Sequence, residues 1–173
     1  MIAAERELVP VTRALRHVVR ALFELYCYDF SPMTNADVNE DGRYTDAHFL
    51  NAWQQNGDQD TWLFLLRVSG RWAGFAWVGR GSFIAPGAHV HWLMEEFFIL
   101  RKYRRQGHGT WLAHRVFSRF PGTWEVGELE ANVPAQQFWR TVIRNYAGDF
   151  EEHRVNNARW QGVVQVFQTP PPS

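Results

Sequence analysis

Cysteine is nearly absent from this sequence, and charge of one sign is not in excess. Cys27 is the only cysteine, which excludes an intramolecular disulfide and a cysteine-based zinc site. It falls in an apolar helical pattern and is interpreted as a packing residue. The 18 basic and 18 acidic residues cancel, so no overall field attracts nucleic acid or an anionic membrane, and any anion site must be local.

Long hydrophobic runs are missing as well. Nowhere do about 18 apolar residues follow one another, as a membrane-spanning helix requires. The N-terminus carries two glutamates and no continuous apolar stretch, unlike a signal peptide. We therefore expect a cytoplasmic protein. Its 173 residues fit one domain over 1–173, with residues 167–173, ending in "TPPPS", expected as a frayed tail.

Aromatic side chains are abundant, at 16% of the chain with nine tryptophans, and predict a bulky core with some aromatic lining of a cleft. Hydrophobic periodicity and turn signals place the elements. Strands are expected at 7–11, 61–68, 71–79, 89–100, 123–132, 150–154 and 160–168. Helices are expected at 12–28, at 45–55, after Gly109 and from Pro134.

The element order β-α-α-β-β-β-α-β-α-β-β predicts a mixed α/β (α+β) domain of about seven strands. In it, an antiparallel meander is joined to one right-handed βαβ crossover. The helix at 12–28 shows the apolar stripe of a helix lying on a core. The connection "FSPMTNADVNEDG" after it is long for a compact domain, and long connections are often functional.

The stretch "RKYRRQGHG" joins an expected strand to an expected helix. The first turn of a helix offers backbone N–H groups without intrahelical partners, and these favour a phosphate. Gly107 and Gly109 remove Cβ atoms that would hold a phosphate away from the backbone. Four cations lie beside this turn: Arg101, Lys102, Arg104 and Arg105. A multiply phosphorylated ligand is expected here.

Two phosphate-binding motifs fit this turn poorly. A P-loop needs a lysine followed by serine or threonine after the second glycine, and Thr110 and Trp111 supply no lysine. A dinucleotide fingerprint needs a third glycine where Leu112 stands, although Glu128 and Glu130 lie near the spacing of its acidic residue. Neither motif is satisfied.

The remaining pattern, Arg-x-x-Gly-x-Gly between a strand and a helix, resembles the GNAT family of acyl-CoA-dependent N-acyltransferases. The segment "EEFFILRKYRR" is similar to the fourth-strand pattern of that family, and "NVPAQQFW" to its Asn-x-x-Ala-x-x-Phe-Tyr segment. The expected element order also fits the family fold over nearly the whole chain. The resemblance implies acetyl-CoA as cosubstrate and a sheet that splays between its fourth and fifth strands.

The resemblance also implies a set of cofactor-binding residues. The backbone from Ile99 to Arg101 would pair with pantetheine, and Arg104 to Thr110 would bind the pyrophosphate. Asn132 would bond the cofactor near its thiol end, although a helix N-cap is an equally good role for it. The full set is Ile99, Leu100, Arg101, Arg104, Arg105, Gln106, Gly107, His108, Gly109, Thr110 and Asn132.

Glu95 and Glu96 are the candidate catalytic residues. Transfer of an acyl group to an amine needs a neutral amine, so a carboxylate near the acceptor is the expected base. Neighbouring strand residues point to opposite faces, so at most one of the two should face the reaction. Because the family commonly uses an acidic residue of this strand, Glu95 is the first choice, as base or as a carboxylate attracting a cationic acceptor.

The proton donor is missing from the pattern. The family usually has a tyrosine seven residues after the asparagine, and here that place holds Trp139, whose indole cannot supply a proton to a thiolate. Tyr146 is about 10 Å further along the helix axis. Three options stay open: unassisted or water-assisted departure, another donor such as Tyr103 or a histidine, or weak catalysis.

No metal site is expected, because His89 and His91 have no third ligand at a recognisable spacing.

We expect an N-acetyltransferase acting on a primary amine of a small molecule. The acceptor wall would come from Phe30–Tyr44 and Gly79–Ala88. The nearby acids suit a cationic amine, although a solvated acidic loop is the simpler interpretation: Asp29, Asp37, Glu40 and Asp41. The alternatives are a peptide or protein amine as acceptor, or a CoA-binding module with weak catalysis. Neither nucleic acid nor membrane is expected as a partner, and a homodimer is left open.

Overall fold

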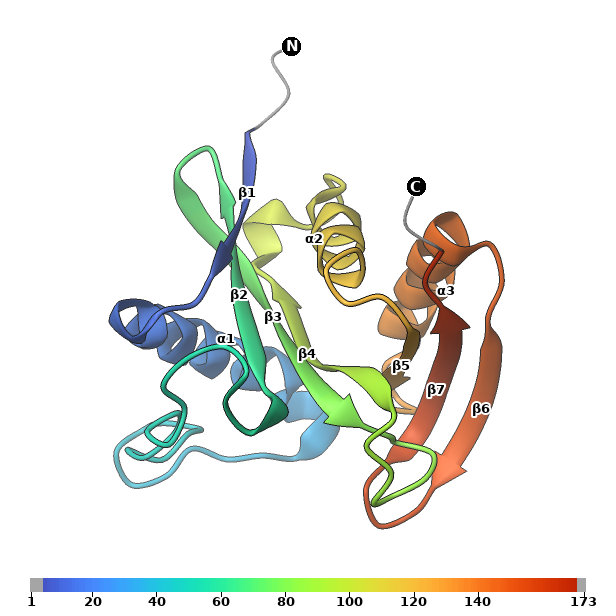
Figure 1. The fold of residues 1–173 in the computed structure, drawn as a ribbon. Helices are drawn as coiled ribbons and strands as arrows, with labels where there is room; N and C mark the ends of the chain where they lie inside the picture. The colour runs from blue at the N-terminus through green and yellow to red at the C-terminus, as the bar shows by residue number, and fades with distance from the viewer. Residues whose placement is uncertain (1–4, 171–173) are drawn as a thin grey trace.

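The computed structural model describes residues 5–170, which form a mixed sheet with helices on both faces (Figure 1). The predicted mixed α/β architecture is confirmed. The strands are β1 (Arg6–Pro10), β2 (Trp62–Val68), β3 (Arg71–Gly81), β4 (His91–Ile99), β5 (Thr123–Glu128), β6 (Glu151–Asn156) and β7 (Gln161–Gln168). The α-helices are α1 (Arg16–Thr34), α2 (His108–Phe117) and α3 (Val133–Ala147).

The seven strands lie in the order β1-β2-β3-β4-β5-β7-β6. Only β4 and β5 run parallel, and they pair over just Trp92–Met94 and Trp124–Val126. Beyond these pairs β4 continues to Ile99 beside β3 alone. The sheet therefore opens between β4 and β5, as the family resemblance implies.

Both faces of the sheet are covered, because its central strands are apolar on both sides. In β2, Leu63 and Leu65 pack in the cluster under α1, whereas Phe64 and Leu66 pack in the cluster under α2 and α3. Figure 1 shows α1 on one side of the sheet and the other two helices on the opposite side. The apolar stripe predicted at 12–28 provides the buried face of α1.

The prediction of a helix at 45–55 is wrong, because this segment forms a series of turns. The Asp46 carboxylate accepts the backbone N–H of His48 at 2.6 Å, and Asp58 accepts that of Gln54 at 2.8 Å. Such local side-chain bonds compete with a helical ladder. Leu50 has φ of 64°, which also ends any helical run.

Several boundaries differ from the prediction; β5, for example, ends at Glu128 instead of residue 132. The helix α1 continues through Pro32 to Thr34. Because Pro32 has no N–H to donate to the Tyr28 carbonyl, this carbonyl instead accepts from the Ser31 hydroxyl at 2.8 Å. The expected frayed tail is wrong at its start, because Phe167 is only 3% exposed and β7 runs to Gln168. Residues 171–173 of that tail lie outside the described residues.

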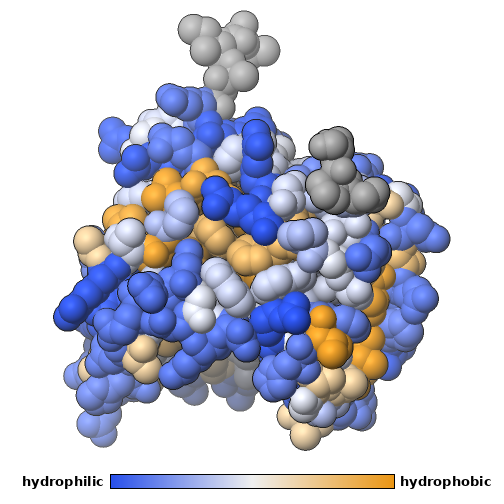
Figure 2. Space-filling view, viewed as in Figure 1, coloured by the Kyte–Doolittle hydropathy of each residue, from blue (hydrophilic) through white to orange (hydrophobic). Residues whose placement is uncertain are grey.

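The surface is mostly hydrophilic on the side shown in Figure 2, with apolar residues in small separate groups. No helix in the described part of the chain is both long and apolar enough to cross a membrane. The large apolar side chains are instead concentrated in the two clusters that sandwich the sheet.

Candidate active site

A β-bulge places Glu95 and Glu96 on the same side of β4. Trp77 of β3 pairs with Glu96 and Val78 pairs with Met94, so Glu95 has no partner of its own. A bulge of this kind interrupts the alternation of side chains. The expectation that the two side chains point to opposite faces of the strand is therefore wrong, since both line one cavity.

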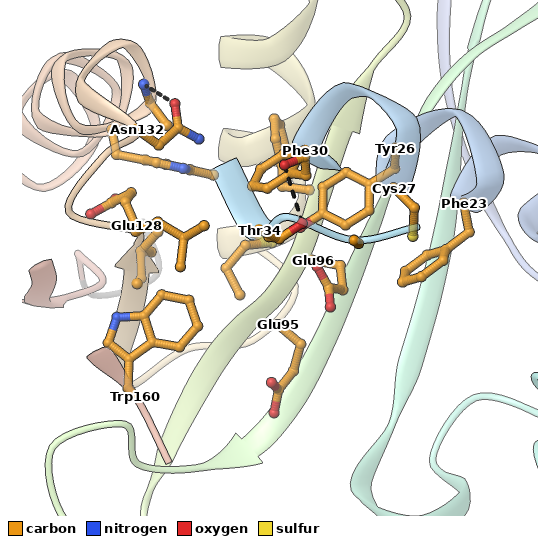
Figure 3. A pocket seen from close by; sticks show the side chains of 18 of the residues that line it. Phe23, Tyr26, Cys27, Phe30, Thr34, Glu95, Glu96, Glu128, Asn132 and Trp160 are labelled. Atoms are coloured by element: carbon orange, nitrogen blue, oxygen red, sulfur yellow. Dashed lines mark hydrogen bonds between the residues drawn. The ribbon is translucent and has the colours of Figure 1, made fainter. Parts of the chain in front are cut away.

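This cavity has a volume of about 390 Å³ and lies where the sheet opens. One wall is α1 with the loop after it, the floor is β4, and the opposite wall is formed by β5 and the start of α3 (Figure 3). Five aromatic side chains of the lining come from α1, the loop and α3: Phe23, Tyr26, Phe30, Tyr44 and Trp139. The cavity thus combines apolar walls with a carboxylate floor.

Of the two β4 carboxylates, Glu96 has no cationic partner among residues 5–170. Burial raises its pKa to about 7, an interaction with the Tyr26 hydroxyl lowers the pKa, and the neighbouring charge of Glu95 raises it. Burial and the Glu96 charge in turn raise the pKa of Tyr26 far above its usual value. Figure 3 shows Tyr26 reaching from α1 toward Glu96. A carboxylate with a pKa near 7 is suited to accept a proton at neutral pH.

Glu95 is held by a cation. The Arg159 guanidinium donates to its Oε1 at 2.8 Å. Burial raises the pKa of Glu95, and the charge and hydrogen bond of Arg159 lower it. The side chain crosses the backbone of Gly79, where an added Cβ would come within 2.7 Å of Oε1. Glu95 is therefore held in one position by an ion pair with Arg159.

Glu128 is a third carboxyl group in the lining, which the sequence did not single out for this site. It is 3% exposed, and neither of its oxygens has a partner in full hydrogen-bond geometry among residues 5–170, although an interaction with the Gln165 side chain acts on it. Burial raises its pKa to about 9, with Gln165 and Arg140 lowering the pKa and Glu152 raising it. In β5, Glu128 follows Trp124 and Val126 on the same face of the strand. A carboxyl group in line with two apolar residues of a buried face is a pattern in the sequence that could have indicated this residue.

The turn before α2 has the geometry expected of a phosphate site. Arg105 and Gly107 have φ of 59° and 76°, a pattern that turns successive N–H groups toward one point. The first intrahelical bond is donated by Trp111 to Gly107 at 3.1 Å, which leaves the N–H groups of His108, Gly109 and Thr110 without a helical partner.

The glycines of this turn do different work. A Cβ on Gly107 would meet no atom within 4 Å, so this side of the turn is open. A Cβ on Gly109 would lie 3.1 Å from the Phe138 ring, so this side packs on α3. The His108 side chain is 3% exposed and its ring points into the protein. Gln106 is exposed and its side-chain amide donates to the Lys102 carbonyl at 2.7 Å.

Two arginines of the turn are bound to α1. Asp29 accepts from Arg101 at 2.7 Å and forms a second ion pair with Arg104. Burial raises the pKa of Asp29, but the two guanidinium groups outweigh burial and the pKa is lowered overall. Arg104 also donates to the Ile99 carbonyl at 2.7 Å, and Leu100 donates to Ala73 of β3 at 2.9 Å. Asp29 is thus not part of the acceptor wall as expected.

Asn132 has both of the roles considered for it. Its side chain accepts the N–H of Ala135 at 3.3 Å as the N-cap of α3, and it also lines the cavity. Trp139, seven residues on, is 5% exposed and packs edge-on against Phe97 of β4, with ring centroids 4.8 Å apart. An indole ring therefore occupies the place where the family pattern has a phenol.

Several expected contributors lie away from the cavity. Tyr146 is hydrogen-bonded to Ser118 at 3.1 Å, and neither it nor Tyr103 lines the cavity. Of the acidic residues expected in the acceptor wall, only Asp37 does. His91 bonds the buried Glu125 at 2.6 Å rather than joining His89. Cys27 lines the cavity, but burial raises the pKa of its thiol to about 11, which suits a packing residue.

Comparison with known proteins identifies the family. A sequence model of the Acetyltransferase (GNAT) family matches residues 13–142. The chain belongs to the GNAT family. A search of curated proteins finds no significant match to this GNAT sequence.

Solved structures share the GNAT fold of this chain at low sequence identity. An acetyltransferase from Thermus thermophilus is 16% identical with a TM-score of 0.66, covering 97% of this chain and 99% of its own. A histone acetyltransferase HPA2 and related acetyltransferase from Corynebacterium glutamicum is 13% identical with a TM-score of 0.66, covering 97% and 98%. The ribosomal-protein-S18-alanine N-acetyltransferase from Escherichia coli is 12% identical with a TM-score of 0.60, covering 98% and 97%. At these identities the likeness is one of fold alone.

GNAT enzymes typically take their acetyl group from acetyl-CoA. The turn before α2 fits the pyrophosphate of that molecule, because it presents free N–H groups, an open side at Gly107 and a cluster of arginines. The carboxylates lie on β4 beside its short pairing with β5, and the turn follows the end of the same strand.

Proposed function

We propose that this GNAT protein transfers the acetyl group of acetyl-CoA to a primary amine of a small molecule by direct attack of the amine. The observation that supports this most is the cavity at the opening of the sheet, with Glu95 and Glu96 side by side on its floor. Its volume of about 390 Å³ falls in the range of small-molecule sites.

Acetyl-CoA supplies a thioester carbonyl as the electrophile. An amine is protonated at neutral pH and must lose a proton before it can attack. Glu96 is the better base of the pair, because its pKa of about 7 allows it to take that proton at its carboxylate. Glu95 is bound to Arg159 and would orient the ammonium form of the acceptor.

The lining indicates the kind of amine. Phe23, Tyr26 and Phe30 form an aromatic wall on α1, opposite Trp160 (Figure 3). Carboxylates below an aromatic wall favour a cationic amine that also carries apolar carbon, because both the charge and the carbon chain find partners. Asp37 adds a further acid to the lining.

A peptide or protein amine is the second candidate acceptor. The Escherichia coli neighbour is by name an enzyme of a ribosomal-protein alanine, but its 12% identity supports the fold only. A third candidate is a CoA-binding module with little catalysis, which Trp139 in the acid position favours. Aromatic walls on both sides of the cavity argue for a small acceptor over a folded protein.

Calorimetry with acetyl-CoA, followed by thiol-release assays, tests the proposal. The amine panel contains a diamine, a polyamine, an aminoglycoside, an aromatic monoamine and a peptide with a free N-terminus. We expect binding of acetyl-CoA and turnover on a small amine. Turnover on the peptide alone would favour the second candidate, binding without turnover would favour the module, and absence of binding would contradict all three.

A further inference from the structure

The turn between β6 and β7 reaches the floor of the cavity from the other half of the sheet. It spans residues 157–160 and belongs to the group of strands β5–β7, whereas Glu95 belongs to β4. The Arg159 guanidinium nevertheless donates to Glu95 Oε1 at 2.8 Å, and the next residue, Trp160, lines the cavity. Two consecutive residues of one turn therefore contact the proposed acceptor site.

Asn157 fixes the shape of this turn. Its Oδ1 accepts the backbone N–H groups of Arg159 at 2.8 Å and of Trp160 at 2.9 Å, and its Nδ2 donates to the Phe83 carbonyl at 2.9 Å. The Arg159 guanidinium also lies over the Phe83 ring, 5.4 Å from its centroid. The guanidinium is therefore presented to Glu95 in one direction, which reduces the entropy cost that usually weakens an ion pair between long side chains.

Trp160 makes the second contact of the turn with the site. A Cβ on Gly127 would lie 2.8 Å from the Trp160 ring, so the indole rests directly on the backbone of β5. Its ring centroid is 4.9 Å from that of Phe83. Figure 3 shows the indole across the cavity from Phe23 and Tyr26. Aromatic rings therefore stand on both sides of the carboxylate floor.

The charge of the floor is smaller than its number of acidic residues suggests. Arg159 neutralises Glu95, although the ion pair leaves Glu95 an oxygen that can accept a hydrogen bond. Burial raises the pKa of Glu128 to about 9, so this carboxyl group is uncharged at neutral pH. Glu96 has no cationic partner among residues 5–170. The floor therefore offers one carboxylate, Glu96, whose charge can be matched by a bound cation.

Two further acidic residues lie near the floor, and both are exposed to solvent. Asp37 lines the cavity from the loop after α1. Asp60 lines a smaller cavity of about 270 Å³, which adjoins the first at Glu95 and Glu96. Solvent and salt screen exposed charges, so these two attract a cation far less than a buried carboxylate does. Neither replaces the charge that Arg159 removes from the floor.

We propose that the acceptor is a monoamine with an apolar or aromatic body, and that Arg159 selects it over a diamine by neutralising Glu95. This inference rests on the proposed function, and it names the class of amine and a residue that determines specificity. The single nitrogen binds Glu96, which also takes its proton, and the body lies between the aromatic side chains of α1 and Trp160. Arg159 acts through Glu95 and is a positioning residue.

A diamine of similar length is disfavoured because the floor has no second carboxylate for it. Its second ammonium would either leave the solvent to lie between aromatic walls without a counter-charge, which is costly, or displace Arg159 from Glu95. Displacement would break an ion pair whose cation is already held in position by the turn. Each route lowers the affinity for the diamine relative to the monoamine.

Two amines of matched shape test the selection. One is 2-phenylethylamine, and the other is the same molecule with a second aminoethyl group in the para position. With acetyl-CoA, the wild type is expected to show a kcat/KM about tenfold higher for the monoamine, since an ammonium buried without a partner costs at least this much. R159M releases the charge of Glu95 and is expected to shift the ratio about tenfold toward the diamine.

R154M is the matched control. Arg154 lies on the same hairpin and pairs with Glu130 at 2.9 Å, and neither of these residues lines the cavity. This variant is expected to keep the wild-type ratio. If R159M lowered kcat/KM equally for both amines, the turn would have a structural role only and the proposal would be overturned. A shift of the ratio by R154M as large as that by R159M would overturn it as well.

A pH series separates the effect of charge from an effect on structure. Burial raises the pKa of Glu95 and Arg159 lowers it, so this pKa is expected to be higher in R159M. A carboxyl group with a raised pKa loses its charge as pH falls, and the gain of R159M on the diamine should therefore fade as the pH is lowered from about 8 to about 5. The ratio between the two amines cancels the effect of Glu96, which is the base for both. A ratio that stays constant in R159M would show that Glu95 does not bind the second ammonium and would overturn the proposal.

This inference and the proposed function fail in different ways. A wild type that acetylates no amine contradicts the proposed function, and with it any selection among amines. A wild type that acetylates amines but accepts the diamine at least as well as the monoamine contradicts only the selection by Arg159.

Discussion

Glu95 and Glu96 are identical neighbours in the chain, yet the fold gives them different chemistry. The bulge brings both to one cavity, and their partners then separate them. Arg159 stabilises the charged form of Glu95, whereas Tyr26 and burial leave Glu96 with a pKa of about 7. The order of preference drawn from the family pattern, with Glu95 first, is therefore reversed in our proposal.

Replacing Glu96 by glutamine is expected to lower kcat for acetyl transfer by about 10²-fold, because a neutral amide cannot accept the amine proton. The base works only when ionised, so the wild-type rate should rise as pH increases through about 7, the pKa of Glu96. The acid limb of the kcat profile, measured by thiol release, should be lost in E96Q.

The matched variant is E95Q. It removes the ion pair with Arg159 but keeps Glu96, so it is expected to raise KM for the amine and to retain the acid limb. If E95Q instead abolished that limb and E96Q kept it, Glu95 would be the base and the assignment would be wrong.

The individual site residues that the sequence predicts are those that belong to a local sequence motif. The phosphate turn, Asn132 and the two β4 carboxylates follow from local patterns. Tyr26 and Glu128 were not assigned to the site, because their importance comes from what the tertiary fold buries around them. Tyr26 looked like one more apolar position of a helix stripe, and only packing brings its hydroxyl to Glu96.

Among the elements, the loop after α1 is bonded to that helix by several side chains, and Glu24 holds the part of it that reaches the cavity. Glu24 of α1 accepts the backbone N–H groups of Tyr44 at 2.8 Å and Thr45 at 3.0 Å, and also the Thr45 hydroxyl. Burial raises the pKa of Glu24, but these hydrogen bonds outweigh burial and the pKa is lowered overall. The loop in turn gives Asp37 and Tyr44 to the cavity, so its position defines one side of the acceptor site.

Replacing Glu24 by glutamine is expected to raise KM for the amine by about tenfold and to leave the Kd for acetyl-CoA unchanged. The amide has only one accepting oxygen for three donors, and a lost hydrogen bond to a charged group weakens binding by this order. Steady-state kinetics and calorimetry measure the two constants. E40Q, at an exposed carboxylate of the same loop, is the control. An equal effect of both variants would contradict the role of Glu24 in positioning the loop.

Elements with strong periodicity were predictable, and those governed by side-chain bonds were not. The apolar stripe at 12–28 and the strands at 61–68 and 71–79 are predictable, because they repeat local signals. For the segment 45–55, Thr45 as an N-cap and Asn56-Gly57 as an end signal predict a helix. Its turns instead depend on Asp46, Asp58 and Arg16, whose guanidinium donates to the Trp53 carbonyl at 2.9 Å.

In the whole molecule, acidic groups fall into two opposed sets. Glu24, Asp29 and Glu152 have lowered pKa values, because hydrogen bonds and cations between distant segments outweigh their burial. Glu96 and Glu128 have pKa values raised by burial to about 7 and about 9. The first set stabilises the fold above the unfolded pKa and loses this effect as pH falls. The second set loses its contribution as pH rises through the raised values.

Stability is therefore expected to peak on the acid side of neutrality, at about pH 5. Thermal unfolding measured between pH 3 and pH 9 should show a maximum there, with a steep fall below it and a gradual fall above it. The double variant E96Q/E128Q should lose the gradual fall and keep the steep one. A wild-type midpoint that climbs steadily to pH 8 would contradict the raised pKa values.

The short contact between β4 and β5 has a mechanical consequence. Three residue pairs are the whole backbone pairing between β1–β4 and β5–β7 in the described chain, so the seven strands behave as two small sheets with a narrow seam. A pantetheine arm in the opening would serve as an eighth strand that exists only while the ligand is bound. Binding of the acyl donor would then join the two halves of the sheet, and each catalytic cycle would close and reopen the seam.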